Sequence, residues 1–269
     1  MSIVKKEKML TFWSERARLY AGDPRANTGG DIWLREIEIA YVDKILKDNF
    51  CPDVLDFGCA NGYSTSRLAK LNLQSRFTGI DINWEMIEAA KINSEQNAAP
   101  NLEYRRYDIL QDDPTTEKYD LIYAIRTFQN IESLEMQKMV LDRLCDRLKP
   151  NGMLLYIESY LDGYRRLNED REKMGLRPLP IHEHLTLLTD EFDNHARSKM
   201  KLMRRDSLSS SYYLATRLLY AYIAKMNNEP IDYNHPIHQV AAIIPQIGVY
   251  GPQNASLYQK SYGTSSKPA

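Results

Sequence analysis

The chain has 269 residues and a formal net charge of −1, from 35 basic and 36 acidic side chains. That length suits one large domain, or one domain with insertions, and the balanced charge gives no electrostatic reason to expect a nucleic-acid partner. The three cysteines, Cys51, Cys59 and Cys145, form no C-x-x-C pair, so we expect neither a disulfide framework nor a structural zinc site. Because the N-terminus lacks the apolar stretch of a signal peptide and no run of about 18 apolar residues occurs, we expect a cytoplasmic protein without a membrane partner.

The predicted elements begin with a helix over most of residues 32–46, for which Asp31 is a suitable N-cap. From residue 53 onward strands and helices alternate. Strands are predicted at 53–57, 76–82, 102–109, 119–128 and 152–160, and helices at 63–72, 84–97 and 134–148, the last of them ended by Pro150 and Gly152. This alternation predicts an α/β protein with a parallel sheet that is covered by helices on both faces.

Beyond residue 160 the periodicity is weaker. A helix and a Gly/Pro loop are expected within 164–180, a helix at 185–198 and a strand at 199–205. Residues 209–226 fit either a strand or a helix, and a short helix near 237–244 precedes a possible strand at 255–260. The tail, 263–269, has the composition of a disordered segment.

The turn after the first strand points to a bound nucleotide. It holds Gly58 and Gly62, which let the backbone turn sharply next to a ligand, and the helix that follows directs free N–H groups at the turn. A turn that binds a pyrophosphate reads G-x-G-x-x-G, whereas this one reads D-x-G-x-x-x-G. Because the carboxylate of Asp56 would repel a pyrophosphate, the turn favours S-adenosylmethionine, which carries a sulfonium and an ammonium but no phosphate, over NAD.

Two further carboxylates follow the next two strands. Asp81 ends the second strand, where an acidic residue can hydrogen-bond both hydroxyls of a ribose. Asp108 follows the third strand, where it can accept a hydrogen bond from an adenine amino group while Ile109 and Leu110 cover the ring. Acids at the ends of three successive strands indicate an adenosine-containing cofactor more specifically than the glycines alone.

The segments VLDFGCANG, GIDIN, RRYDIL, YDLIYAI and LKPNGMLLYIES, in this order, resemble the S-adenosylmethionine-dependent methyltransferases with a Rossmann-like fold. The resemblance covers roughly residues 35–160 and departs at Cys59-Ala60-Asn61, where many members have more glycine. It implies a doubly wound, mostly parallel seven-stranded sheet with helices on both faces. It also implies four parts of the chain: an N-terminal lid (1–34), a cofactor-binding core (35–160), an acceptor-binding insertion with the last strands and a C-terminal extension (161–262), and the disordered tail (263–269). A homodimer is a further expectation.

The resemblance also implies a set of cofactor-binding residues. The lid segment FWSERARLY is similar to leading segments in which an aromatic or an arginine folds over the cofactor. The candidates are Trp13, Tyr20 and Arg35 in this region, Asp56, Gly58, Cys59, Ala60 and Gly62 at the turn, Asp81, Ile82 and Met86 at the ribose, Asp108, Ile109 and Leu110 at the adenine, and Arg126 beside the methionine part.

The methyl acceptor should lie beyond the fourth and fifth strands, against residues 126–130 and 158–164, which are rich in hydrogen-bonding groups. An alcohol acceptor must lose its proton, and the candidates for that base are His182, His184 and Glu158. Residues 209–217 also offer hydroxyls and an arginine for an anionic group on the acceptor. No clear metal-ligand set is found, and the sequence after the fourth strand, AIRTFQN, argues against methylation of a nucleic-acid base.

The predicted function is therefore methyl transfer to a small polar acceptor, with O-methylation of a sugar or related metabolite as the first expectation. A loose similarity of residues 158–217 to methyltransferases of bacterial polysaccharide and natural-product genes favours a sugar-like acceptor. The alternatives are N-methylation of an amino sugar or amine, an NAD(P)-dependent oxidoreductase, and a non-catalytic cofactor-binding subunit.

Overall fold

The computed structural model describes residues 2–21, 23, 25, 29–97, 99–112 and 116–261. The tail at 263–269, for which disorder is predicted, lies outside these residues. Within them, none of the helices has the length and apolar character that crossing a membrane requires.

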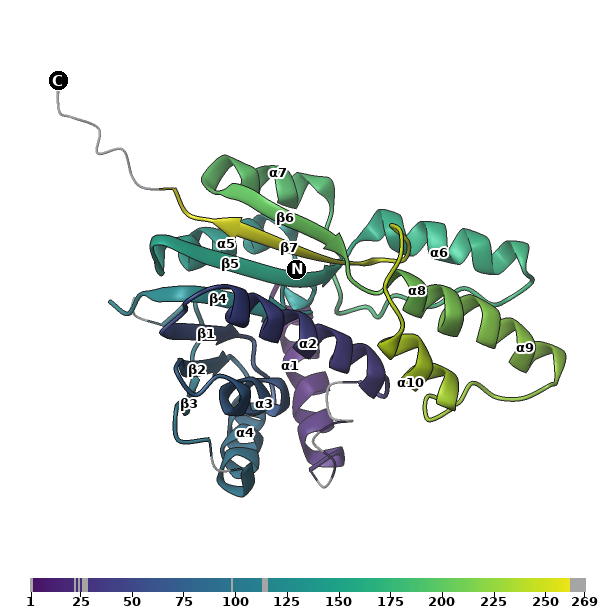
Figure 1. Ribbon diagram of the computed structural model, residues 1–269, viewed down its shortest axis with the longest axis horizontal. Helices are drawn as coiled ribbons and strands as arrows, with labels where there is room; N and C mark the ends of the chain where they lie inside the picture. Colours follow the sequence, from purple (N-terminus) through teal and green to yellow (C-terminus); the bar gives the residue numbers. More distant parts are fainter. Residues whose placement is uncertain are drawn as a thin grey trace.

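One mixed sheet forms the centre of the described chain (Figure 1). Its order is β3-β2-β1-β4-β5-β7-β6, and β7 alone runs in the direction opposite to the other strands. The strands are β1 (Asp53–Phe57), β2 (Arg76–Asp81), β3 (Leu102–Arg106), β4 (Tyr119–Ile125), β5 (Leu148–Ser159), β6 (Lys201–Ser207) and β7 (Gln253–Gln259). The predicted seven-stranded, mostly parallel Rossmann-like sheet is thereby confirmed.

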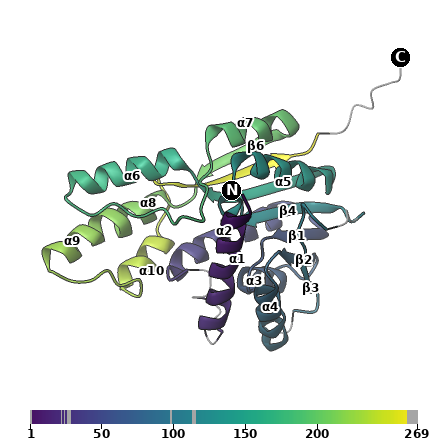
Figure 2. The ribbon, with the colours of Figure 1, turned by 180° about the vertical axis from the view of Figure 1, so that it is seen from behind.

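Helices cover the sheet and extend beyond it (Figures 1 and 2). They are α1 (Ser2–Leu19), α2 (Ile32–Asp48), α3 (Tyr63–Leu71), α4 (Trp84–Asn97), the 3-10 turn η1 (Phe128–Asn130), α5 (Leu134–Asp146), α6 (Leu161–Lys173), α7 (Asp190–Lys199), α8 (Ser210–Tyr213), the π-helical η2 (Leu214–Tyr220), α9 (Ala221–Met226) and α10 (Pro236–Ile243). The helices α6, α8, α9 and α10 gather together beyond one end of the sheet.

The alternation of side chains along each strand divides the core into two layers. Val54 and Leu121 point to the face that α2 and α3 cover, while their chain neighbours Leu55 and Ile122 point to the face of α5 and α7. The central strands are apolar on both faces because helices cover both, as a doubly wound parallel sheet requires. Asp31 accepts a hydrogen bond from the N–H of Leu34 and thus caps α2 as predicted.

Three local expectations need correction or completion. The helix α5 ends at Asp146 rather than at the predicted residue 148, because Leu148 already pairs with Tyr119 in the sheet. Residues 210–226 are helical, which resolves the alternative left open between strand and helix. The second predicted helix of the insertion begins at Asp190, five residues later than expected, since Leu188 bridges to Tyr160 beforehand.

The strand order locates the ligand site. Successive strands run outward from β1 to β3 on one side and from β4 to β5 on the other, so the winding direction reverses between β1 and β4. In open α/β sheets ligands bind beyond the carboxyl ends of the strands at such a reversal.

Candidate active site

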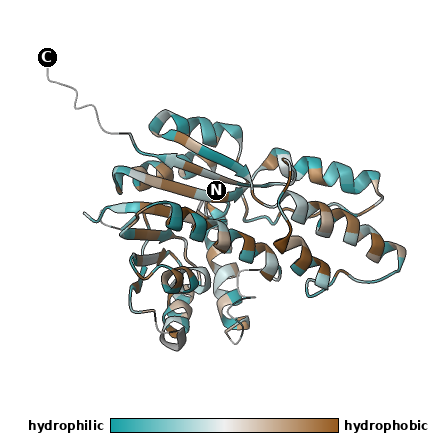
Figure 3. Ribbon diagram, viewed as in Figure 1, coloured by the Kyte–Doolittle hydropathy of each residue, from teal (hydrophilic) through white to brown (hydrophobic). Residues whose placement is uncertain are grey.

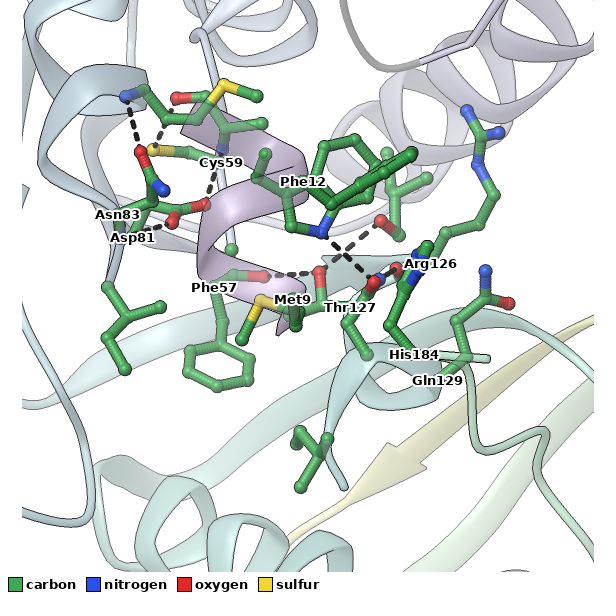
Figure 4. Close-up of a pocket in the computed structure, with 18 of the residues that line it drawn as sticks. Met9, Phe12, Phe57, Cys59, Asp81, Asn83, Arg126, Thr127, Gln129 and His184 are labelled. Atoms are coloured by element: carbon green, nitrogen blue, oxygen red, sulfur yellow. Dashed lines mark hydrogen bonds between the residues drawn. The ribbon is translucent and has the colours of Figure 1, made fainter. Parts of the chain in front are cut away.

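A cavity of about 510 Å³ lies at the carboxyl ends of β1, β2 and β4, where the winding reverses. Figure 4 shows Asp81 and Asn83 on one side of it and Arg126 and His184 on the other, with Phe12 of α1 between them. The volume lies within the range of small-molecule and cofactor sites. The cavity therefore joins the predicted cofactor end to the predicted acceptor end.

The glycine turn has left-handed backbone at three residues, Gly58, Ala60 (φ +48°) and Gly62. Gly58 has φ +77° and Gly62 has φ +70°, and the N–H groups of Gly58 and Cys59 both donate to the carbonyl of Ile80. A Cβ on Gly62 would lie 2.3 Å from the hydroxyl of Tyr104, which itself donates to the Gly62 carbonyl. Only glycine fits there without displacing Tyr104, so Gly62 shapes the turn from behind and is not part of the cavity lining.

Asp56 lies under the turn and is almost fully buried. Its Oδ2 accepts hydrogen bonds from Thr65 at 2.6 Å and from Tyr123 at 2.8 Å. Burial raises the pKa of this carboxyl to about 7; the two hydrogen bonds oppose the rise and the charge of Asp81 adds to it. The charge of Asp56 is therefore poised to respond to a cation placed in the cavity.

Asp81 joins the turn to the start of α4. Its Oδ2 accepts from the N–H of Ala60 at 2.9 Å, and its Oδ1 accepts from the N–H of Asn83 at 2.8 Å. Asn83 in turn donates to the carbonyl of Leu10 and the hydroxyl of Ser14 on α1. Each carboxylate oxygen can accept a second hydrogen bond, so Asp81 is oriented by the backbone and still able to bind ligand hydroxyls.

Asp108 already has a charged partner from the N-terminal helix. Its Oδ2 lies 2.8 Å from Nζ of Lys6, and its Oδ1 accepts from the N–H of Leu110. Ile109 and Leu110 line the same part of the cavity, as predicted for residues that cover an adenine ring. An adenine amino group would have to share this carboxylate with Lys6 or replace Lys6.

The N-terminal segment that the sequence suggested as a lid forms α1 and lies over the cavity. Lys6, Met9, Trp13 and Arg16, spaced three, four and three residues apart, present one helix face to it. Trp13 Nε1 donates to Oδ1 of Asn130 at 3.1 Å, which connects α1 to the segment after β4. This helix thus contacts both the cofactor side and the acceptor side.

A buried charged group lies at the end of the cavity away from Asp81 (Figure 4). Arg126, in a left-handed conformation at φ +54°, forms a two-pronged ion pair with the fully buried Glu38, with N···O distances of 3.0 and 3.1 Å. Gln253 also donates to Glu38. Burial and the charge of Arg126 lower the pKa of the nearby Arg35 to about 10, which leaves it protonated at neutral pH. Both guanidinium groups act electrostatically on the single carboxylate of Glu38, so this end favours an anionic group.

The three candidate bases occupy different environments. His184 is buried and packs against the Phe12 ring in a tilted arrangement, with ring centroids 4.4 Å apart, while His182 is exposed; both line the cavity. Burial, His182 and Lys5 lower the pKa of His184. Glu158 does not line the cavity: its oxygens accept from the backbone N–H groups of residues 127–129, and burial raises its pKa to about 8.

The structure brings most of the predicted cofactor residues together. Those that line the cavity are Trp13, Arg35, Asp56, Gly58, Cys59, Ala60, Asp81, Ile82, Met86, Asp108, Ile109, Leu110 and Arg126. Tyr20 and Gly62 lie outside the described lining, and Arg16 packs over the Tyr20 ring at 4.5 Å.

Sequence reasoning missed several lining residues, chiefly Lys6, Met9, Phe12 and Glu38, whereas Asn130 belongs to the predicted acceptor segment 126–130. The helical spacing of Lys6, Met9 and Trp13 was a usable signal for a cavity-facing helix, but nothing local marked Glu38 as the partner of Arg126. The anionic-group site suggested within 209–217 does not reach the cavity: Arg217 pairs with Asp31, and its neighbouring serine hydroxyls bond to carbonyl and amide oxygens. Among the described residues, no group of three or more His, Cys, Asp or Glu side chains is arranged to hold a metal ion.

A doubly wound sheet with this strand order, a glycine turn, and acids at the ends of three successive strands defines an enzyme of the nucleotide-cofactor-binding α/β class. The chain belongs to the methyltransferase domain family, whose model matches residues 52–213. The match confirms the predicted family, and with it S-adenosylmethionine as the cofactor.

Similar proteins support the same assignment. A malonyl-acyl-carrier-protein O-methyltransferase of Acetivibrio thermocellus is 28% identical over 177 residues, which are 61% of this chain and 60% of the relative. A mitochondrial ubiquinone biosynthesis O-methyltransferase of Candida albicans is 31% identical over 114 residues, which are 42% of this chain and 33% of the relative. The chain thus spans less than two thirds of the length of these two relatives.

The fold also matches solved structures. Magnesium protoporphyrin IX methyltransferase of Synechocystis PCC 6803, with bound S-adenosylhomocysteine, is 13% identical and superposes with a TM-score of 0.62, covering 97% of this chain and 100% of that one. At this identity the likeness concerns the fold alone.

Proposed function

We propose that this methyltransferase transfers the methyl group to an oxygen of a small polar acceptor, with a sugar or a related metabolite as the leading class. The proposal depends mainly on the position of His184, whose side chain is buried in the wall of the cofactor cavity. Its lowered pKa keeps the imidazole neutral at neutral pH, the form that accepts a proton. An alcohol acceptor needs such a base as its oxygen forms the new bond.

The polar lining of the acceptor end supports a polar substrate. Gln129 and Asn130 line this end, and Asn130 is held by hydrogen bonds from Trp13 and to the carbonyl of Arg126. Their side chains come from η1, whose backbone N–H groups are anchored on Glu158. We therefore assign Glu158 a positioning role and His184 the role of the base.

The cofactor, when bound, supplies an electrophilic methyl group on a cationic sulfur. On this proposal Arg35 and Arg126 hold its carboxylate, Asp56 lies near its cationic groups, and Asp81 binds its ribose. The charged groups that line the cavity support this assignment. Carboxylates lie where the hydroxyls and cationic groups of the cofactor are expected, and guanidinium groups lie at the opposite end, where its carboxylate is expected. In this arrangement α1 is the lid.

Incubation with S-adenosylmethionine carrying a deuterated methyl group, followed by mass spectrometry, tests the proposed function. Separate pools of neutral sugars, amino sugars, amines and proteins serve as acceptors. We expect labelled O-methyl products from the neutral sugars. Label on nitrogen alone would favour the alternative N-methyltransferase, and release of S-adenosylhomocysteine only with a protein acceptor would rule out a small-molecule substrate.

Cofactor affinity should depend on pH through Asp56. A cation in the cavity favours the carboxylate, and the pKa of Asp56 is about 7 in its absence. Affinity for S-adenosylmethionine should then rise by up to about ten-fold between pH 6 and pH 8, as Asp56 loses its proton. Isothermal titration calorimetry at both pH values measures this change.

S-adenosylhomocysteine is the matched ligand control, since it keeps the ammonium and the carboxylate but lacks the positive sulfur. Its affinity should change less over the same pH range. In the Asp56→Asn variant, the affinities for the two ligands should no longer differ in their dependence on pH. Equal pH dependence for both ligands in the unsubstituted protein would place Asp56 away from the sulfonium.

A further inference from the structure

The helical unit beyond the sheet exposes an unusual amount of apolar surface. Of the described residues, 21 large hydrophobic side chains are exposed, and 12 of these lie within residues 214–249. They include Leu219, Ile223 and Met226 on η2 and α9, and Val240, Ile243 and Ile247 on and after α10. Figure 3 shows the corresponding brown segments on α9 and α10, and α10 packs against η2, which continues directly into α9. We call this the α9–α10 surface.

The helical spacing shows that this exposure is organised. The exposed residues 219, 222, 223 and 226 repeat at intervals of three and four along η2 and α9, and 240 and 243 are three residues apart on α10, so each helix has an outward apolar stripe as well as an inward one. Ile244 and Ile247 are exposed in the non-helical segment that follows α10. The inward stripes are already used: α10 packs on α2 and η2, with His238 and Ala241 buried. The outward stripes have no covering element among the described residues.

The exposed apolar area makes up most of what one partner of a stable interface buries. The 12 side chains are 38% to 78% exposed, so even at roughly 50 Å² of apolar surface each they expose on the order of 600 Å². Apolar patches on monomers reach about 300–600 Å², and one partner of a standard interface buries about 800 Å². With a polar rim, the α9–α10 surface reaches the size of one half of such an interface.

The charge pattern indicates what kind of partner covers the α9–α10 surface. Residues 236–250 contain no Asp, Glu, Lys or Arg, and residues 214–249 hold two basic and two acidic residues. A helix that lies on a lipid surface carries Lys and Arg on its polar side, and a charged partner would need a complementary field. In a two-fold interface each residue near the axis meets its own copy, so an uncharged, apolar patch is the one that avoids like-charge contacts.

We infer that the α9–α10 surface is the interface of a symmetric homodimer, with a second copy of this chain as its occupant. The inference goes beyond the proposed function and does not depend on the methyl acceptor. It also gives a role to the C-terminal extension: α10 packs on α2, whose residues Arg35 and Glu38 line the cavity, so the interface lies one helix away from the active site.

Sedimentation velocity of the full chain, over a wide range of concentration, tests this inference. We expect the unsubstituted protein to sediment with the mass of two chains. Ile243→Asp, at a side chain 74% exposed, should raise the dimer dissociation constant by on the order of a hundred-fold, because dimerisation would bury a carboxylate. Ile223→Asp should do the same from α9. Leu73→Asp, 67% exposed in the α3–β2 loop, is the matched control and should leave the dimer intact.

Binding of S-adenosylhomocysteine reports whether each variant is folded, since none of the three substitutions lies in the cavity. A protein that is monomeric at every concentration would overturn the inference. A dimer that survives both Ile243→Asp and Ile223→Asp would also overturn it. An unsubstituted protein that stays monomeric and floats with neutral phosphatidylcholine vesicles would overturn it as well and would identify the surface as a lipid contact.

Discussion

Replacing Asp81 by alanine should weaken the binding of S-adenosylhomocysteine by on the order of a hundred-fold, or about 3 kcal/mol. On our proposal the carboxylate accepts two hydrogen bonds from ribose hydroxyls, and such charge-assisted bonds are stronger than neutral ones. The substitution also removes the acceptor for the N–H groups of Ala60 and Asn83, so the glycine turn loses its tie to β2. Calorimetry with the product avoids any dependence on turnover.

Two comparisons separate recognition of the ribose from loosening of the turn. The 2′-deoxy analogue of S-adenosylhomocysteine should bind the unsubstituted protein less tightly than the parent ligand, and Asp81→Ala should no longer distinguish the two. Glu88→Ala removes a half-exposed carboxylate from α4 and should leave both affinities unchanged. If Asp81→Ala retained the preference for the hydroxyl, the ribose would be bound elsewhere.

His184→Asn should lower kcat by about 10²- to 10³-fold with little change in the affinity for S-adenosylhomocysteine. The imidazole is neutral above its lowered pKa and protonated below it. The rate of the unsubstituted enzyme should therefore fall as the pH drops through a value below 6.5, and stay level around neutrality. The measurement is kcat against pH with an acceptor found in the labelling experiment.

His182→Asn is the matched control, because His182 lies in the same loop and cavity but is exposed. It should keep most of the activity and the acidic limb of the pH profile, whereas His184→Asn should lose that limb. A His184→Asn enzyme with an unchanged pH profile would show that this histidine serves only to pack against Phe12, and the base would have to be sought elsewhere.

The core of the fold was predictable because its signals are local. A buried parallel strand must be apolar on both faces, so VLDF and LIYAI can be recognised one segment at a time. The glycine turn and the acids after β1, β2 and β3 lie within a few residues of strands that could be identified. Their common location then follows from the rule that parallel strands end at the same edge of the sheet.

The acceptor end was much harder to predict because its contacts join distant parts of the chain. Glu158, a candidate base from sequence, is held inside by backbone N–H groups near residue 128, about 30 residues away. Residues 209–226 could not be assigned because a helix buried on one face and apolar on the other loses the usual periodicity.

From the sequence alone, the class of protein, the cofactor and the central sheet could be determined, since strand composition, turn chemistry and the spacing of three acids are properties of short segments. Only the tertiary structure decided what surrounds the reacting groups. Lys6 meets Asp108 across 102 residues, and Arg126 meets Glu38 across 88. The sequence near each residue does not reveal such pairs, because a lysine or a glutamate on a helix can have the same sequence neighbours whether it faces water or a cavity. The packing of the whole chain decides whether the side chain faces water or the cavity.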